Sequence, residues 1–458
     1  MAEAQEPQPA PSPTKIVPLT KDTRDNLVSS FKRRLDSMQP PLVAISLILF
    51  GLVLLLCSVP LGLLSVDTDK VESVSRQVGY LPAINWSIGI GFLSPAMIYF
   101  WLSAYKKVPG LLDSLVRGGM LLDSGGNIIG SSNDLLIRWD AILRRCLLGP
   151  GLSLAIIVLI ACLVEWWGTS AHPLLASNPA IAWEKELDWS VGVLLNNPHA
   201  SVLLRVSNAV FTFVCFLLQA LAASCLLLFC LMNFTFAVFV QGMSIVPSLK
   251  SSDKRCGFEK FEPLLQDVLF AAVFASLLFY TSRLQNAYLH SGTKDSSLLS
   301  FILPDVAKGA ELVAKLKDIL KDPEKLKDLL ANLSQSAFHD YSDAMVFIGG
   351  VVVALGTLFI IIIVLRGSAI EGKRRLEDLI DAAHDPLNLP AGFTADQAKA
   401  KLANMEVWPL QYVSLNRLLT LCLFTIASLW LYRVGIFVAA YSLISALQKV
   451  AAGKKKSE

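Results

Sequence analysis

The sequence predicts an all-α fold, a polytopic helical membrane protein with about seven transmembrane helices. The chain is 54% hydrophobic and only 17% charged, against about 25% charge in soluble domains. Its mean hydropathy is +0.55, and the apolar residues gather in long runs of the length that spans a bilayer. Because the hydrocarbon offers no hydrogen bonds, the backbone of such runs must pair internally, so we expect helices.

Seven apolar runs account for the expected spans. Each approaches or exceeds the roughly 20 residues that a helix needs to cross the hydrocarbon. Residues 41–281 therefore hold transmembrane helices one to five, and residues 344–448 hold helices six and seven, with a helical cytoplasmic loop at 366–415 between them. The runs are residues 41–65, 81–105, 146–168, 208–243, 263–281, 344–365 and 416–448.

The two ends of the chain are polar. Residues 1–40 begin with the proline-rich stretch AEAQEPQPAPSP, which lacks the apolar residues for a core and predicts a disordered cytoplasmic tail. The basic residues Lys32, Arg33 and Arg34 precede the first run. That run is longer than the apolar part of a signal peptide, which indicates an uncleaved signal anchor. Residues 449–458 form a second basic tail.

The distribution of basic residues predicts the orientation in a cell or inner membrane. Lysines and arginines gather in the amino-terminal tail and in the loops at 106–145, 244–262 and 366–415, and they are sparse at 66–80 and 169–207. Cytoplasmic loops carry this excess, so we expect a cytoplasmic amino terminus. None of the eight cysteines falls in a loop expected outside, which agrees with this orientation or reflects only good packing in apolar helices.

Three loop segments have patterns of their own. Residues 282–343 alternate charged residues with leucines at helical spacing, which predicts a small extracytoplasmic helical hairpin. The stretch MLLDSGGNIIGSS, at 120–132, predicts a β-hairpin around a glycine turn. Thr394 and Gln397 have the spacing of a capping box at the start of a helix.

Arg433 lies in the middle of the last run, and Arg417 stands at its beginning. The run from Arg417 to Lys449 is about 47 Å long as a helix, too long for one crossing and short for two. Trp430 and Tyr432 flank Arg433, a mixture typical of the membrane–water interface. We therefore expect Arg433 at the outer edge of the seventh span, with an eighth crossing as the alternative that would bring the carboxyl terminus inside.

Polar residues in the fourth run form a stripe. Asn208, Gln219, Asn233 and Gln241 lie within about 80° of one another at helical periodicity. Such a stripe should face protein or water rather than lipid. It predicts either hydrogen bonding to neighbouring helices or the wall of a conduit. Asp267, near the start of the fifth run, is an expected interfacial charge at a helix amino terminus.

Enzyme chemistry finds little support in the sequence. All five histidines lie outside the apolar runs, and their spacing matches no metal-ligand motif. Neither a Walker loop nor a Rossmann glycine pattern occurs. The sequence thus predicts no catalytic residue, no metal site and no cofactor, and the net charge of +3 gives no reason to expect nucleic acid.

Two functional hypotheses remain. The first is a non-enzymatic membrane scaffold, sensor or assembly partner, whose partners are the lipid bilayer and other membrane proteins or a second copy of the chain. The second is a channel or uncoupled transporter that uses the polar stripe of the fourth helix. A conduit requires that stripe to line a polar cavity, whereas a scaffold has it packed against other helices.

Overall fold

A computed structural model describes residues 21–63, 66–67, 77–78, 80, 85–122, 131–171, 201–252, 254–289, 341–381 and 394–406. The chain divides into two units, Met1–Met38 and Gln39–Glu458. The described residues are nearly all helical, as the sequence predicts.

The first unit contains one helix, α1 (Lys21–Ser37). The sequence places these residues in a disordered tail, and for them that expectation is wrong. The reason is local: Leu27, Phe31 and Leu35 follow one another at four-residue spacing, which gives the segment an apolar stripe. Residues 1–20 of the expected tail lie outside the described residues.

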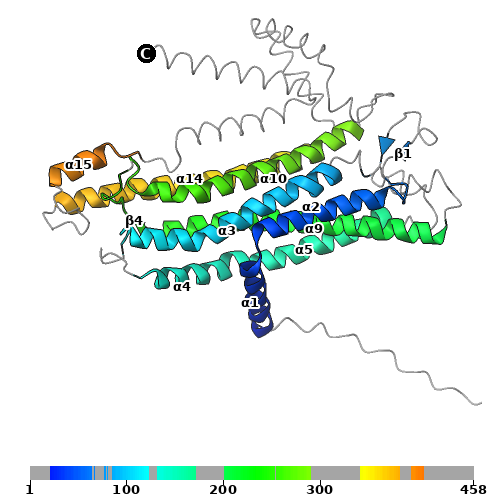
Figure 1. Cartoon of the computed structure of the whole chain (residues 1–458), viewed down its shortest axis with the longest axis horizontal. Coiled ribbons are helices and arrows are strands. Elements are labelled where there is room, and N and C mark those ends of the chain that lie inside the picture. The colour runs from blue at the N-terminus through cyan, green and yellow to red at the C-terminus, as the bar shows by residue number, and fades with distance from the viewer. Residues whose placement is uncertain are drawn as a thin grey trace, which may run out of the picture. The chain divides into compact units, whose positions relative to one another are not determined.

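The second unit is a bundle of long helices (Figure 1). Two pairs of short antiparallel strands, β1 with β2 and β3 with β4, accompany the helices. The strands are β1 (Val66–Asp67), β2 (Gln77–Val78), β3 (Leu121–Leu122) and β4 (Ser244–Ile245). The helices are α2 (Pro40–Ser58), η1 (Asn85–Leu93), α3 (Ser94–Arg117), α4 (Ser132–Ile142), η2 (Leu143–Leu148), α5 (Gly149–Trp166), η3 (Trp167–Ala171), α9 (Val202–Gln241), η4 (Phe258–Phe261), α10 (Glu262–Leu289), α14 (Tyr341–Asp381) and α15 (Ala395–Ala403).

Within the described residues, 5 helical stretches are long and apolar enough to cross a membrane. They correspond to the first five expected spans. The sixth expected span, 344–365, lies inside α14, whose helical backbone is described. The seventh expected span, 416–448, lies outside the described residues. An eighth crossing, which would fall in the same segment, therefore stays a prediction. The 5 stretches are Pro40–Ser58, Trp86–Arg117, Ser132–Trp166, Val202–Gln241 and Phe258–Leu278.

Several expected segments have other boundaries in the structure than the sequence predicts. The first span ends at Ser58 rather than at 65, because the chain turns at Val59 and Pro60. Residues 282–289 continue α10, so they do not belong to the expected outer hairpin. Most of that hairpin, residues 290–340, lies outside the described residues, as does 449–458.

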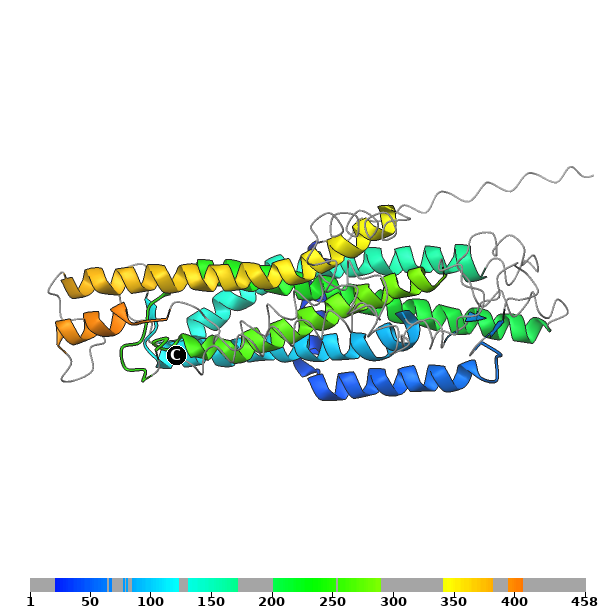
Figure 2. The same cartoon turned by 90° about the horizontal axis from the view of Figure 1, so that it is seen from above.

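The helices of the bundle pack in a definite order. Helix α2 packs on α3 and η1, α3 packs on α10, α10 on α14, α14 on α9, and α9 on α5. Figures 1 and 2 show the helices running along the long axis of the bundle. We call the end at α15 and β4 the inner end, and the opposite end, near β1, the outer end.

The bundle is longer than a bilayer is thick. Helix α9 has 40 residues and α14 has 41, which correspond to about 60 Å each, against about 30 Å of hydrocarbon. Helix α2, with 19 residues, matches one crossing. In Figure 1, α3, α4 and α14 continue past the start of α2 toward α15. The inner part of the bundle is therefore an extension that the apolar length of α2 does not cover.

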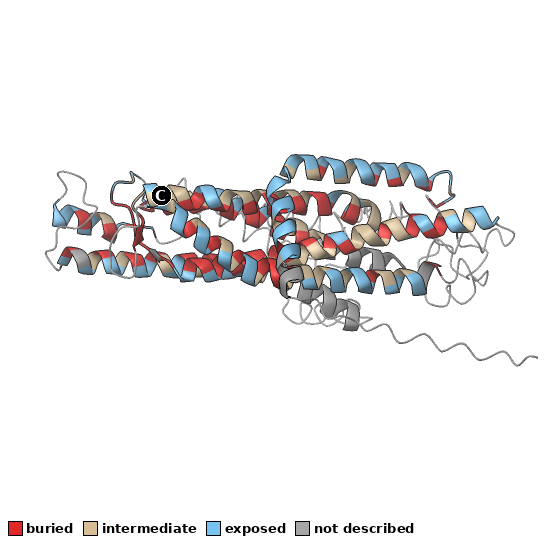
Figure 3. Ribbon diagram, turned by 90° about the horizontal axis from the view of Figure 1, so that it is seen from below, coloured by how far each residue is buried: buried red, intermediate tan, exposed pale blue. Residues whose placement is uncertain are grey.

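Exposed apolar side chains form a surface on the bundle that suits contact with lipid. Figure 3 shows the exposed residues of α2 and α5 on the outside of the bundle. In water such surface would be unfavourable, whereas in hydrocarbon it costs nothing. The exposed large apolar residues of α2 are Leu42, Ile45, Leu49, Phe50, Leu52, Val53 and Leu56, and those of α5 are Ile156, Ile157, Leu159, Ile160 and Val164.

Two π-helical segments precede prolines. The segment η1 runs into Pro95 and η2 runs into Pro150. Each proline lacks an N–H, and its ring clashes with the carbonyl four residues earlier, which lies within the π segment. Widening the helix there relieves the clash. In η1 the small residue Gly91 also meets Gly51 of α2, where an added Cβ would come within 3.2 Å of the Gly91 Cα.

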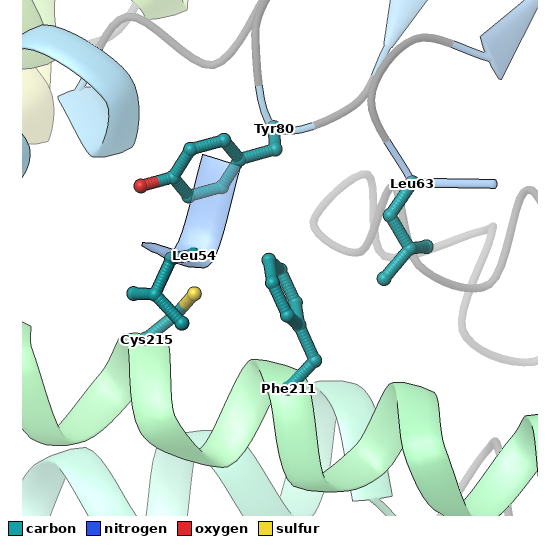
Figure 4. Packing of buried hydrophobic residues seen from close by; sticks show 5 residues of the cluster. All are labelled: Leu54, Leu63, Tyr80, Phe211 and Cys215. Atoms are coloured by element: carbon teal, nitrogen blue, oxygen red, sulfur yellow. The ribbon is translucent and has the colours of Figure 1, made fainter. Parts of the chain in front are cut away.

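A cluster of buried side chains closes the outer end between α2 and α9 (Figure 4). Leu54 of α2 packs with Phe211 and Cys215 of α9. Leu63 and Tyr80, from the loop between α2 and η1, complete the cluster. The Tyr80 and Phe211 rings meet edge to face at 5.7 Å. Burial raises the pKa of the Tyr80 phenol well above its usual value. Leu63 and Tyr80 are thereby packed onto α9 by apolar contacts.

Candidate functional site: an inner clamp and a buried amide face

The connection between α9 and α10 is folded rather than loose. We call residues 242–263, with the side chains that hold them, the inner clamp. It begins at Gly242, the C-cap of α9. Arg138 of α4 donates a hydrogen bond to the Gly242 carbonyl at 3.0 Å, so a cation lies at the negative end of α9. A side chain at 242 would collide with that guanidinium, at 2.9 Å from an added Cβ.

The clamp next pairs with the connection after α3. Leu121 faces Ile245 and Leu122 faces Ser244 in an antiparallel register, and the Val246 N–H donates to the Met120 carbonyl at 2.8 Å. The expected hairpin at 120–132 is wrong at its first strand, because β3 pairs with a strand that is remote in sequence. Residues 123–130 lie outside the described residues.

The second half of the clamp is a tight turn around a small core. The Ser248 N–H donates to the Cys256 carbonyl at 2.7 Å. Cys256 and Gly257 both have positive φ, 51° and 96°, which glycine adopts freely and cysteine only under strain. The rings of Phe258 and Phe261 stack at 5.9 Å below the turn, and both are buried.

Lysines from distant elements hold the carbonyl groups of the clamp and of its neighbours. Lys401 of α15 donates to the carbonyls of Leu249, at 2.9 Å, and of Ser251. Lys260 donates to the Ser114 carbonyl at 2.6 Å, near the end of α3, where a cation suits the helix dipole. Charged donors thereby bind backbone carbonyls of the clamp and at the end of α3.

The inner half of α14 and the helix α15 complete the clamp. Gly372 of α14 lies against the backbone of Ile245 so closely that an added Cβ would overlap the Ile245 carbonyl oxygen. The Glu406 N–H donates to the Lys254 carbonyl at 2.9 Å. The expected capping box of α15 is confirmed. Lys399 of α15 is ion-paired with Asp381 of α14, and this hydrogen bond raises the pKa of the lysine.

Two ion pairs fix the start of α10. The buried Arg255 pairs with Glu262 at 2.9 Å. Asp267 receives Lys107 of α3 at 2.6 Å and the Ser103 hydroxyl at 2.6 Å. Because α10 begins at Glu262, Asp267 lies beyond its first turn. The negative charge of Asp267 is therefore neutralised by Lys107. The sequence suggested instead the free backbone N–H groups at the amino terminus of the helix.

The amide stripe of α9 divides into three environments. Asn208 and Asn233 are completely buried, Gln219 is half-buried, and Gln241 is exposed. The Asn233 amide donates to the Thr357 hydroxyl of α14 at 3.2 Å. Neither side-chain polar atom of Asn208 has a hydrogen-bond partner in the described structure. The stripe is about 50 Å long, so its members belong to one helix face and not to one compact site.

The neighbourhood of Asn208 includes one polar contact between α9 and α5. The indole N–H of Trp166 donates to the Thr212 hydroxyl and to the Ala209 carbonyl, each at 3.2 Å. Thr212 in turn donates to the carbonyls of its own helix. This side of α9 is therefore packed against α5.

Arg417 and Arg433, the other expected interfacial charges, lie outside the described residues. Among the described residues, no group of three His, Cys, Asp or Glu side chains could hold a metal ion. Sequence reasoning missed Lys107, Arg255, Gly372 and Lys401. The partners of Lys107, Gly372 and Lys401 are remote in sequence, and the spacing of Arg255 and Glu262 matches no local pattern.

The fold and the site together define a class: a nearly all-helical protein with several helices able to span a membrane and a folded clamp at the inner end of the bundle. Residues 4–444 match the family model described as RcgA-like. The chain belongs to the RcgA-like family. Neither a curated protein nor a solved structure matches it.

Proposed function

We propose that the protein is a non-enzymatic membrane scaffold, sensor or assembly partner, with the amino terminus and the inner clamp in the cytoplasm. The observation that supports this proposal is the burial of the two asparagines in the amide stripe of α9. Asn208 and Asn233 are completely covered, and Thr212 on the same side of the helix is nearly so. A conduit along α9 would need these groups to meet water, whereas a scaffold needs them to join helices.

The inner extension supports the same proposal. Four cationic side chains hold the clamp or Asp267 to neighbouring elements, and they come from α3, α4, α15 and the clamp itself. These hydrogen bonds between elements stabilise one arrangement of the helices outside the hydrocarbon. The inner extension therefore presents a rigid surface, which suits the binding of another protein or of a second copy of the chain. In our proposal seven helices cross the membrane, with 282–343 outside and 366–415 inside.

The competing proposal, a channel or uncoupled transporter, has one observation in its favour. The Asn208 amide is buried without a hydrogen-bond partner in the described structure, a state that costs about 1–3 kcal/mol. In a conduit, water or a permeant would satisfy this amide. In a scaffold the unpaired amide only lowers the stability of the fold, so replacing Asn208 with an apolar residue should not destabilise the protein.

Flux and stability measured on the same variants separate the two proposals. We expect no ion or small-solute flux through proteoliposomes containing the wild-type chain. Asn233→Leu should lower the melting temperature in detergent, because it loses the bond to Thr357, worth about 1 kcal/mol. Asn208→Leu should leave it unchanged or raise it. Gln241→Leu, at an exposed position, is the matched control. Flux that Asn208→Leu alters would overturn the scaffold proposal.

A further inference from the structure

Helix α1 is amphipathic and basic. At 100° per residue, its apolar residues occupy an arc of about 100°, and Lys32, Arg33 and Arg34 lie outside this arc. The two edges of the arc differ: Val28 and Leu35 are buried, whereas Leu27 and Met38 are exposed. One edge of the apolar face therefore remains open to a partner.

The open edge carries an exposed cation. Arg34 falls within about 40° of Leu27 and Met38, and it is exposed. Lys32 is paired with Asp36 at 3.7 Å, but no ion pair of the Arg34 side chain is found among the described residues. Arg33 lies about 120° from Leu27, on the polar side of the helix. An apolar edge bordered by a guanidinium group is complementary to a surface that presents phosphates above hydrocarbon.

The position of α1 along the chain favours a lipid surface as the partner. Only Met38 and Gln39 separate the end of α1 from Pro40, where the first apolar helix begins. Two residues span at most about 7 Å. The end of α1 is thus held at the level where α2 enters the membrane. The charge pattern places this level at the cytoplasmic leaflet, where anionic lipids are enriched.

We propose that the exposed edge of α1, formed by Leu27, Arg34 and Met38, binds the headgroups of anionic phospholipids in the membrane that α2 crosses. The apolar side chains enter the interface, and the Arg34 guanidinium binds a lipid phosphate. This inference goes beyond the scaffold proposal and rests on α2 being a membrane span that begins at the cytoplasmic leaflet. An acidic protein segment is the competing occupant.

Photocrosslinking in the full-length chain tests the proposal. Benzoylphenylalanine at Leu27 is activated in nanodiscs of neutral lipid and in nanodiscs with roughly a quarter anionic lipid, and adducts are identified by mass spectrometry. We expect lipid adducts mainly with anionic lipid and their loss at about 0.5 M salt, where screening is strong. Arg34→Gln should lower the ratio of membrane-docked to undocked α1 roughly 5-fold.

Two controls make the outcomes distinct. The same crosslinker at Leu56, which is exposed on α2, should give lipid adducts in every nanodisc, and its failure would count against the membrane span instead. Arg374→Gln with Arg375→Gln, on the inner part of α14, should leave the Leu27 adducts unchanged. Equal Leu27 adducts in neutral and anionic nanodiscs, adducts insensitive to Arg34→Gln, or adducts to protein alone would each overturn the proposal.

Discussion

At the scale of single residues, the charges at the inner end are compensated by partners on other elements. Asp267 is almost completely buried, and it is neutralised by Lys107 and held by Ser103. Lys107 also donates to the Pro263 carbonyl at 3.2 Å, so one lysine ties α3 to two points of α10. Removing one charge of such a pair costs more than removing both, because the remaining charge stays buried.

A double-mutant cycle on this pair should show strong coupling. Lys107→Met leaves the Asp267 carboxylate with Ser103 alone, and we expect a loss of about 1–3 kcal/mol, less than for a fully buried pair because the lysine is partly exposed. Adding Asp267→Leu should restore much of the stability. The measurement is the melting temperature in detergent.

The exposed pair of Arg117 with Asp113, at 2.7 Å, provides the control for that cycle. Arg117→Met should change stability by no more than about 0.5 kcal/mol. Additive effects of the Lys107 and Asp267 substitutions would contradict the coupling.

At the scale of elements, the clamp depends on close backbone contact. Helix α14 approaches β4 at Gly372, where no side chain fits, because the carbonyl of Ile245 occupies the place of a Cβ. Helix α15 then attaches to the same connection through Lys401. The helix that continues the sixth apolar run is thereby fixed to the connection between the fourth and fifth.

Two glycines of α14 should respond in opposite ways to alanine. Gly372→Ala must displace the Ile245 backbone, and overpacking of this kind costs about 1–3 kcal/mol. Gly367→Ala has no atom within 4 Å of its added Cβ, and alanine favours a helix over glycine by up to about 1 kcal/mol. Thermal unfolding of the two variants in detergent should give a lower and an unchanged or higher melting temperature, respectively. A neutral Gly372→Ala would mean that α14 and β4 lie further apart.

At the scale of the whole molecule, the bundle combines an apolar part with an inner extension. Of the described residues in the basic loops, β4 and α15 lie at the inner end, and β1, from a sparsely charged loop, lies at the outer end (Figure 1). In our proposal the inner extension is cytoplasmic, as expected from the distribution of lysine and arginine.

Cysteine labelling in intact cells should report this orientation. Leu203→Cys, at a position that is 77% exposed on α9, should react with an impermeant maleimide added outside. Ile137→Cys, at a position that is 60% exposed on α4, should react only after permeabilisation. The wild-type chain supplies the baseline of its native cysteines, of which Cys57 is exposed. Labelling of Ile137→Cys from outside would reverse the topology.

The sequence by itself determined the helical class, the five helices able to span a membrane and the capping box at Thr394. These features depend on run length, periodicity and spacing within a few residues. The tertiary structure decided the pairing of β3 with β4, the contact at Gly372 and the attachment of Lys401, and it divided the amide stripe into buried, half-buried and exposed members. The physical reason is distance along the chain. Lys107 and Pro263, or Lys401 and Leu249, are more than a hundred residues apart, and only the packing of the helices brings them within hydrogen-bond range.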